Sequence, residues 1–147
     1  MRLFLDTCAL NRPWDDQGQI RIHREAESVL FLVEEALDGR VELVTSDYLL
    51  HEVMQIADPQ RRERVLALLD SASLHVSASD TLFRRATEFA AFSITGYDAL
   101  HLAAAEFAGC SWLVTTDDKL LKRCQRASRI TSVQPLNPAD WPPLRTP

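Results

Sequence analysis

The chain has 147 residues, a length that fits one globular domain able to bury a substantial apolar core. Hydrophobic residues make up 46% and charged residues 25%, which excludes a disordered chain and a coiled coil. The formal net charge of −5 argues against a protein that binds nucleic acid over its whole surface, because such proteins are usually basic. No apolar stretch approaches the roughly 20 residues of a membrane helix, so we expect no membrane association.

In the first half of the chain, apolar runs alternate with turn signals. The predicted elements are, in order, a strand at residues 3–5, a loop at 11–18, a helix at 23–37, a strand at 41–45, and helices at 47–56 and 59–69. Gly39 is placed to end the first long helix, and Ser46 is suited to cap the helix that follows the second strand.

The second half continues the alternation. Its predicted elements are a weak strand at 74–77, helices at 80–92 and 98–108, a strand at 112–115, a helix at 119–124, and an edge strand at 130–133. The fold class is therefore α/β, a single domain with a short parallel sheet of about four to five strands flanked by helices on both faces. We assign residues 1–133 to this domain. Residues 134–147 form a proline-rich C-terminal tail that packs on the domain or frays.

The N-terminus and the cysteines indicate a cytoplasmic protein. The first apolar run meets Asp6 too early for a signal peptide. Cys8, Cys110 and Cys124 are odd in number and form no Cys-x-x-Cys pair, so neither a disulfide frame nor a zinc site is expected. We expect reduced thiols, with Cys8 packed as a small buried hydrophobe.

Four acidic residues stand just beyond apolar runs, and they are Asp6, Glu52, Asp98 and Asp117. The carboxyl ends of parallel strands converge on one crevice, so acids far apart in the sequence can meet there. Carboxylates that converge repel one another, and a hard divalent cation relieves that repulsion. The sequence therefore predicts a carboxylate site for Mg²⁺ or Mn²⁺.

Each acid also has a simpler structural explanation. Asp98 and Asp117 precede helices and could cap them, and Glu52 could face solvent, although its apolar neighbours indicate a partly buried face. Two other families also place an acid directly after the first strand, but this sequence lacks their further acidic residues. Haloacid-dehalogenase-like phosphatases place a second Asp where Cys8 stands, and response-regulator receivers need an Asp after the third strand, where residues 77–79 provide none.

Considered together, the motifs resemble the PIN domain, a family of metal-dependent ribonucleases that includes the VapC-type toxins of bacterial toxin–antitoxin pairs. The matching motifs are Leu5-Asp6-Thr7, the segment from Ser46 to Glu52, Asp98-Ala99-Leu100-His101-Leu102-Ala103-Ala104-Ala105, and Leu113-Val114-Thr115-Thr116-Asp117. Their order, their spacing and their position relative to the predicted strands agree with the family, from Arg2 to about Val133.

The resemblance implies an endoribonuclease whose catalytic and metal-binding residues are Asp6, Glu52, Asp98 and Asp117. We expect Asp6 and Asp98 to contact the ion directly, and Glu52 and Asp117 to hold ion-bound waters or a second ion. Supporting roles are expected for three neighbouring side chains, Thr7, Thr115 and Asp118. The products expected in this family carry a 5′-phosphate and a 3′-hydroxyl.

The resemblance also implies partners. RNA is the expected substrate, with transfer RNA as a candidate target. An antitoxin protein is expected to block the site, and the protein is expected to form a homodimer. The alternatives are a non-catalytic PIN-like module that binds RNA or protein, which the intact set of four acids disfavours, and a structure-specific DNA nuclease. The chain shows no insertion that could clamp a DNA flap or junction, and this disfavours the DNA nuclease.

Basic and aromatic residues near the motifs have mostly structural explanations. His101, one turn after Asp98, and His51, beside Glu52, are interpreted as packed or surface imidazoles rather than proton shuttles. Trp14 is assigned to core or interface packing. Basic clusters are usually solvated helix faces, but four basic residues follow the acids closely and are candidate substrate contacts: Arg12, Lys119, Lys122 and Arg123.

Overall fold

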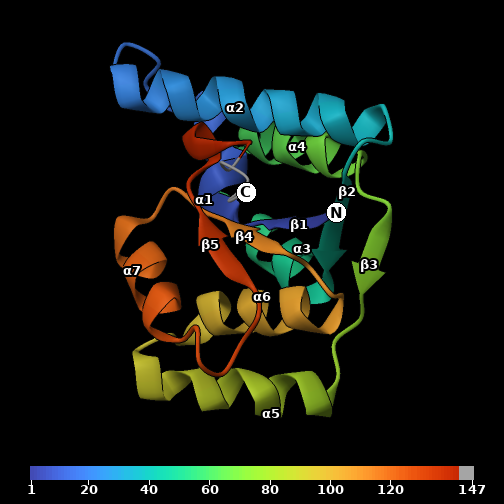
Figure 1. The fold of residues 1–147 in the computed structure, drawn as a ribbon. Helices are drawn as coiled ribbons and strands as arrows, with labels where there is room; N and C mark the ends of the chain where they lie inside the picture. Colours follow the sequence, from blue (N-terminus) through green and yellow to red (C-terminus); the bar gives the residue numbers. More distant parts are fainter. Residues whose placement is uncertain (143–147) are drawn as a thin grey trace.

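The computed structural model describes residues 1–142 and contains a five-stranded sheet whose neighbouring strands are all parallel. The strands are β1 (Arg2–Leu5), β2 (Glu42–Ser46), β3 (Leu74–Val76), β4 (Trp112–Val114) and β5 (Gln134–Leu136). They lie in the order β3-β2-β1-β4-β5, so the first strand of the chain forms the centre of the sheet (Figure 1). The predicted α/β class with a parallel sheet is confirmed.

Helices cover both faces of the sheet, as predicted. They are α1 (Thr7–Asn11), α2 (Ile20–Leu37), α3 (Asp47–Val53), α4 (Pro59–Leu69), α5 (Asp80–Glu88), α6 (Gly96–Phe107) and α7 (Asp118–Arg126). Short 3₁₀ turns occur at η1 (Arg12–Trp14), η2 (Phe89–Phe92) and η3 (Pro138–Asp140). Figure 1 shows α2 and α4 on one side of the sheet and α5 and α6 on the other. Within residues 1–142, no helix has the length and apolar character to cross a membrane.

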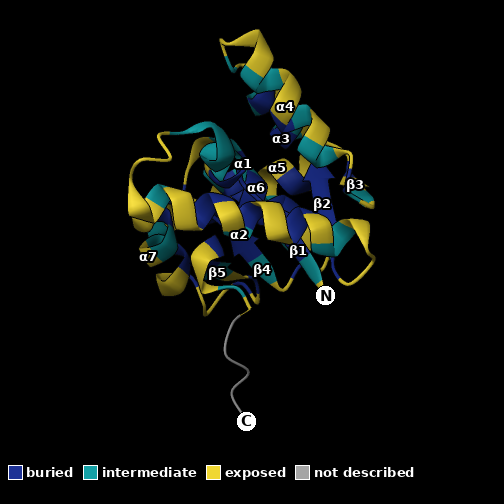
Figure 2. Cartoon of the chain, turned by 90° about the horizontal axis from the view of Figure 1, so that it is seen from above, coloured by how far each residue is buried: buried dark blue, intermediate teal, exposed yellow. Residues whose placement is uncertain are grey.

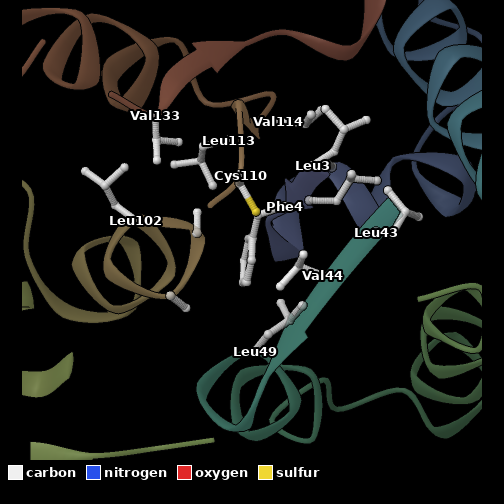
Figure 3. Packing of buried hydrophobic residues seen from close by; sticks show 14 of the residues in the cluster. Leu3, Phe4, Leu43, Val44, Leu49, Leu102, Cys110, Leu113, Val114 and Val133 are labelled. Carbon is white, nitrogen blue, oxygen red and sulfur yellow. The ribbon is translucent and has the colours of Figure 1, made fainter. Parts of the chain in front are cut away.

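The core lies between the sheet and these helix layers. Phe4 of β1 is fully buried, and Figure 3 shows it between Val44 of β2 and Leu113 of β4. Strands of a parallel sheet are covered on both faces, which is why β1 is apolar without alternation. Helix α2 instead buries one stripe against the domain, including Val29 and Leu32, and leaves its other face exposed (Figure 2).

Helix α1 begins directly after β1 and was not predicted from the sequence. The Asp6 side chain caps it by accepting a hydrogen bond from the backbone N–H of Ala9 at 2.9 Å. A five-residue helix is too short to show an apolar period, and only Ala9 and Leu10 of α1 are buried. The cap fixes the direction in which the chain leaves the central strand.

The predicted last strand was placed too early in the sequence. Residues 130–133 form no strand, and the edge strand is β5, made by residues assigned to the C-terminal tail. Gln134 donates its backbone N–H to Ser111 O, and Leu136 O accepts from Thr115 N, each at 3.0 Å. Pro135 lies opposite Leu113 of β4 and lacks a backbone N–H, but β5 is the edge strand of the sheet, and a proline is tolerated on an edge strand. Of the predicted tail, residues 143–147 lie outside the described residues.

Leu136 and Gln134 provide a test of this strand. Leu136 is buried and Gln134 is exposed, although both lie on β5. We expect Leu136→Ala to lower the free energy of unfolding by about 2–5 kcal/mol, through lost transfer energy and a cavity. Gln134→Ala should change it by less than about 0.5 kcal/mol. Urea unfolding measures both values, and equal effects of the two substitutions would contradict the assignment of β5.

Candidate active site

The polar ends of the central strands meet at one edge of the sheet. From β1 the chain proceeds to β2 on one side, whereas β4 lies on the other side, so the strand order reverses between β1 and β4. Ligand crevices of open parallel sheets lie at such reversals, beyond the carboxyl ends of the strands. Asp6 directly follows β1, and its backbone N–H donates to Val114 O of β4 at 3.0 Å.

A pocket of about 500 Å³ opens at this edge, and all four predicted acids line it. The lining residues are Asp6, Thr7, Cys8, Asn11, Arg12, Asp15, Glu52, Asp98, Thr116 and Asp117. The acids come from four places in the chain, namely the end of β1, helix α3, the first turn of α6 and the start of α7. The tertiary structure thus brings together carboxylates that are up to 111 residues apart, from 6 to 117.

Asp6 is the most deeply buried of these acids, with 2% of its surface exposed. Burial raises the pKa of Asp6 from 3.8 to about 6, and the negative charge of Asp98 adds to the effect. Hydrogen bonds from Thr115 and Ala9, together with the charge of His101, act in the opposite direction. Burial therefore disfavours the ionised form of Asp6, and a nearby cation would stabilise that form.

Glu52 is held by two side-chain donors. Its Oε1 atom accepts hydrogen bonds from the Thr7 hydroxyl and from His101 Nε2, the latter at 2.9 Å. Burial raises the pKa of Glu52, but the hydrogen bonds from His101 and Thr7 outweigh it and hold the pKa below its usual value. Glu52 is consequently ionised at neutral pH. Thr7, predicted as a supporting residue, lies in contact with one of the acids.

Asp98 and Asp117 differ in how they are held. Asp98 lies inside the first turn of α6, whose N-cap is Thr95, so it is not the helix cap considered from the sequence. Burial raises the pKa of Asp98; His101 and Arg123 lower it, and the charges of Asp117 and Glu52 raise it further. Asp117 does cap α7, through Oδ1, which accepts from the backbone N–H groups of Lys119 and Leu120 at 2.9 and 3.2 Å.

The two other residues predicted to support the site are placed differently. Thr115 is fully buried, and its hydroxyl accepts from the Asp117 backbone N–H at 3.1 Å, which orients the start of α7. The Asp118 side chain is 59% exposed and lies outside the pocket lining. Arg21 donates to both carboxylate oxygens of Asp118, at 2.9 and 2.8 Å, and holds its pKa below the usual range. The structure thus separates Asp118 from the four acids.

Of the candidate substrate contacts, only Arg12 lines the pocket. It donates to Asp15 at 3.2 Å and to Glu25 at 3.0 Å. Glu25, on α2, is 1% exposed and also accepts from Asn137 at 2.6 Å. Sequence reasoning missed Glu25 and Asp15, because a helical glutamate and a loop aspartate carry no local signal of burial or pairing.

The three basic residues of α7 stand beside the pocket rather than in its lining. Lys119 and Lys122 are exposed, and Arg123 is half-buried. The charge of Arg123 lowers the pKa of Asp98.

Cys8 lines the pocket and is exposed, so the expectation of a buried cysteine was wrong. The side chain sits in the first turn of the unpredicted helix α1, next to Asp6. Although part of the residue is exposed, the surrounding protein partly desolvates the thiol, and this effect together with the charges of Asp6 and Asp117 raises the pKa of Cys8 to about 12. A thiol that stays protonated at neutral pH is a poor nucleophile.

The donor set of the pocket is suited to a hard cation. Among residues 1–142, no three Asp, Glu, His or Cys side chains converge closely enough to form a ready-made metal cage. Mg²⁺ does not require one, because it keeps several waters and binds through one or two carboxylates. Four acids around one pocket, with the pKa of Asp6 and Asp98 raised, match that chemistry.

The fold and the pocket define a parallel α/β domain with a carboxylate-rich site at its strand-order reversal. The family model described as the PIN domain matches residues 3–126, and the chain belongs to the PIN-domain family. The search of curated proteins found no match.

Solved structures with this fold include two VapBC proteins. VapBC2 from Rickettsia felis, described as bound to a DNA fragment from its promoter, aligns with a TM-score of 0.58 at 15% identity, over 93% of this chain and 98% of that chain. VapBC-1 from nontypeable Haemophilus influenzae aligns with a TM-score of 0.59 at 13% identity, over 94% of this chain and 98% of that chain. At these identities, the likeness concerns the fold.

The raised pKa of Asp6 predicts a stability effect that depends on pH. The pKa is higher in the folded than in the unfolded chain, so the folded protein loses stability as pH rises from about 4 to about 6. Metal-free Asp6→Asn should therefore exceed the wild type in unfolding free energy, by up to about 3 kcal/mol near pH 7.5, and the difference should vanish near pH 4.

Urea unfolding in EDTA at both pH values measures this difference. Asp118→Asn is the matched control, because Arg21 stabilises the charged form of Asp118 and neutralising it should not stabilise the protein. A variant Asp6→Asn that is no more stable than the wild type near pH 7.5 would contradict the raised pKa of Asp6.

Proposed function

We propose that the protein is a Mg²⁺- or Mn²⁺-dependent endoribonuclease. The observation that carries this proposal is the convergence of Asp6, Glu52, Asp98 and Asp117 on one pocket at the carboxyl edge of the sheet. Membership of the PIN-domain family supports it, because nucleases are typical of that family. Asp6 and Asp98 hold the cation, and Glu52 and Asp117 hold waters or a second ion.

The chemistry follows from the residues of the pocket. When bound, a divalent cation activates water and neutralises the charge of the phosphodiester. Asp6 and Asp98, whose pKa values are raised, would gain most from a bound cation, because its charge would stabilise their ionised forms. Arg12, held by Glu25 and Asp15, provides a fixed positive charge at the pocket wall for a phosphate of the substrate.

We further propose that the protein is the toxin of a VapBC-like pair, inhibited by an antitoxin and active as a cytoplasmic homodimer. Similarity in fold to two VapBC proteins supports the pairing. Exposed apolar side chains on α2, including Leu30 and Phe31, provide surface for a partner. Cys8, Cys110 and Cys124 are free, which suits a reducing compartment.

Cleavage of total cellular RNA tests the nuclease. Wild-type protein, folded and free of partner, should give discrete fragments with Mg²⁺ or Mn²⁺ and none with EDTA. Asp6→Asn and Asp98→Asn should abolish cleavage, because each removes a charge that holds the cation. Asp118→Asn is the control and should cleave as the wild type does, since Asp118 lies outside the pocket.

Two outcomes would overturn this assignment. Cleavage at the wild-type rate by Asp6→Asn or Asp98→Asn would exclude these residues from the site. No cleavage with either ion would favour the alternative of a non-catalytic module that binds RNA or protein.

Lys119 provides a separate test of substrate binding. It is exposed and follows Asp117 closely, so it is placed to contact a phosphate without a role in the fold. With Asp6→Asn as an inactive background, Lys119→Gln should weaken RNA binding and reduce the slope of log K against log salt by about one. Arg64→Gln, exposed on α4, is the control. Equal slopes for all three proteins in a salt titration would remove Lys119 from the interface.

A further inference from the structure

Glu52 is held in the site differently from the two acids that cap helices. Asp6 and Asp117 accept hydrogen bonds from backbone N–H groups at the starts of α1 and α7, so their positions follow from helix formation itself. Glu52 lies in the last turns of α3, where the backbone N–H groups are already used within the helix. Its orientation depends instead on two side chains, Thr7 and His101.

Both donors bind the same oxygen of Glu52. Thr7 Oγ1 and His101 Nε2 each donate to Oε1, and within residues 1–142 no protein donor reaches Oε2. An ionised carboxylate only accepts hydrogen bonds, so Nε2 of the imidazole carries a proton. Glu52 therefore directs one oxygen to the protein and keeps the other for a ligand of the pocket that it lines.

His101 is placed for this single contact. Its ring is 1% exposed, stacks on Tyr97 with 6.0 Å between centroids, and packs against Phe4 with 5.4 Å between centroids. Its Nδ1 atom is buried without a hydrogen-bond partner. A buried polar atom without a partner destabilises the folded protein, and an apolar side chain of similar size would avoid this cost. Packing alone thus gives no reason for an imidazole here, whereas the bond to Glu52 does.

We propose that His101 is a positioning residue of the carboxylate site. Together with Thr7 it fixes Oε1 of Glu52, so that Oε2 is presented to the cation or its waters in one orientation. The inference rests on the proposed function, because it concerns the same cation. It goes beyond that function by assigning the orientation of one acid to a buried histidine of α6 that carries no role in cleavage itself.

The affinity of the folded protein for Mn²⁺, measured by titration calorimetry without RNA, tests the proposal. His101→Leu removes the donor and keeps an apolar side chain in the core, and it should weaken Mn²⁺ binding by about 10–100-fold, as is usual for a residue that orients a metal ligand. His101→Gln, which restores an N–H near the position of Nε2, should recover most of the affinity. Unfolding by urea, measured in parallel, shows that each variant is folded.

His75→Leu is the matched control. His75 Nε2 also contacts a carboxylate, Asp47, at 2.6 Å, but neither residue lines the pocket. This variant should bind Mn²⁺ as the wild type does. If His101→Leu fails to fold, Thr7→Val tests the same contact from the other donor, with Thr7→Ser as the variant that keeps the hydroxyl.

The outcomes separate the two proposals. Equal Mn²⁺ affinity of the wild type, His101→Leu and Thr7→Val would overturn the positioning role and leave the nuclease proposal intact. Equal losses in His101→Leu and His101→Gln would also overturn it, because packing and not the donor would then matter. Absence of Mn²⁺ binding by the wild type would overturn the cation site, and the positioning role with it.

Discussion

The parallel pairing of β1 with both β2 and β4 is the constraint on which the site depends. The register joins Phe4 to Val44 on one side and to Leu113 on the other, so the strands end at the same edge of the sheet. Asp6 leaves the central strand at that edge, and the segments carrying the other acids begin there or pack against it. Phe4 is fully buried in this register, and a shift of one residue would turn its ring to the opposite face and disrupt the packing of the core.

Convergence of carboxylates costs the folded protein electrostatic energy. Burial of Asp6 and Asp98 raises both pKa values. Hydrogen bonds to Asp6 and the positive charges near Asp98 offset only part of that cost. The domain tolerates the strain because its core is otherwise continuous and apolar. Such a balance is common where a site is built for a ligand that the chain itself does not provide.

The buried carboxylate of Glu25 positions Arg12 in the lining of the pocket. Glu25 of α2 binds Arg12, Arg21 and Asn137, and thus connects the first loop, the long helix and the segment after β5. Arg61 of α4 adds a bond to Asp15 at 2.8 Å. A buried carboxylate with several donors is well compensated, and its role here is to fix geometry rather than to add stability. The position of Arg12 at the pocket therefore depends on elements far from it in the sequence.

The sequence by itself determined the fold class, the alternation of elements and the identity of the four acids, because apolar runs, glycine stops and motif spacing are local signals. The tertiary structure decided what local signals do not encode. It moved the edge strand to residues 134–136, where Pro135 is tolerated because this strand lies at the edge of the sheet. It paired Asp118 with Arg21 outside the pocket lining, and it left Cys8 exposed in the pocket. It also joined His101 to Glu52, 49 residues apart, and such partnerships exist only once the chain has folded.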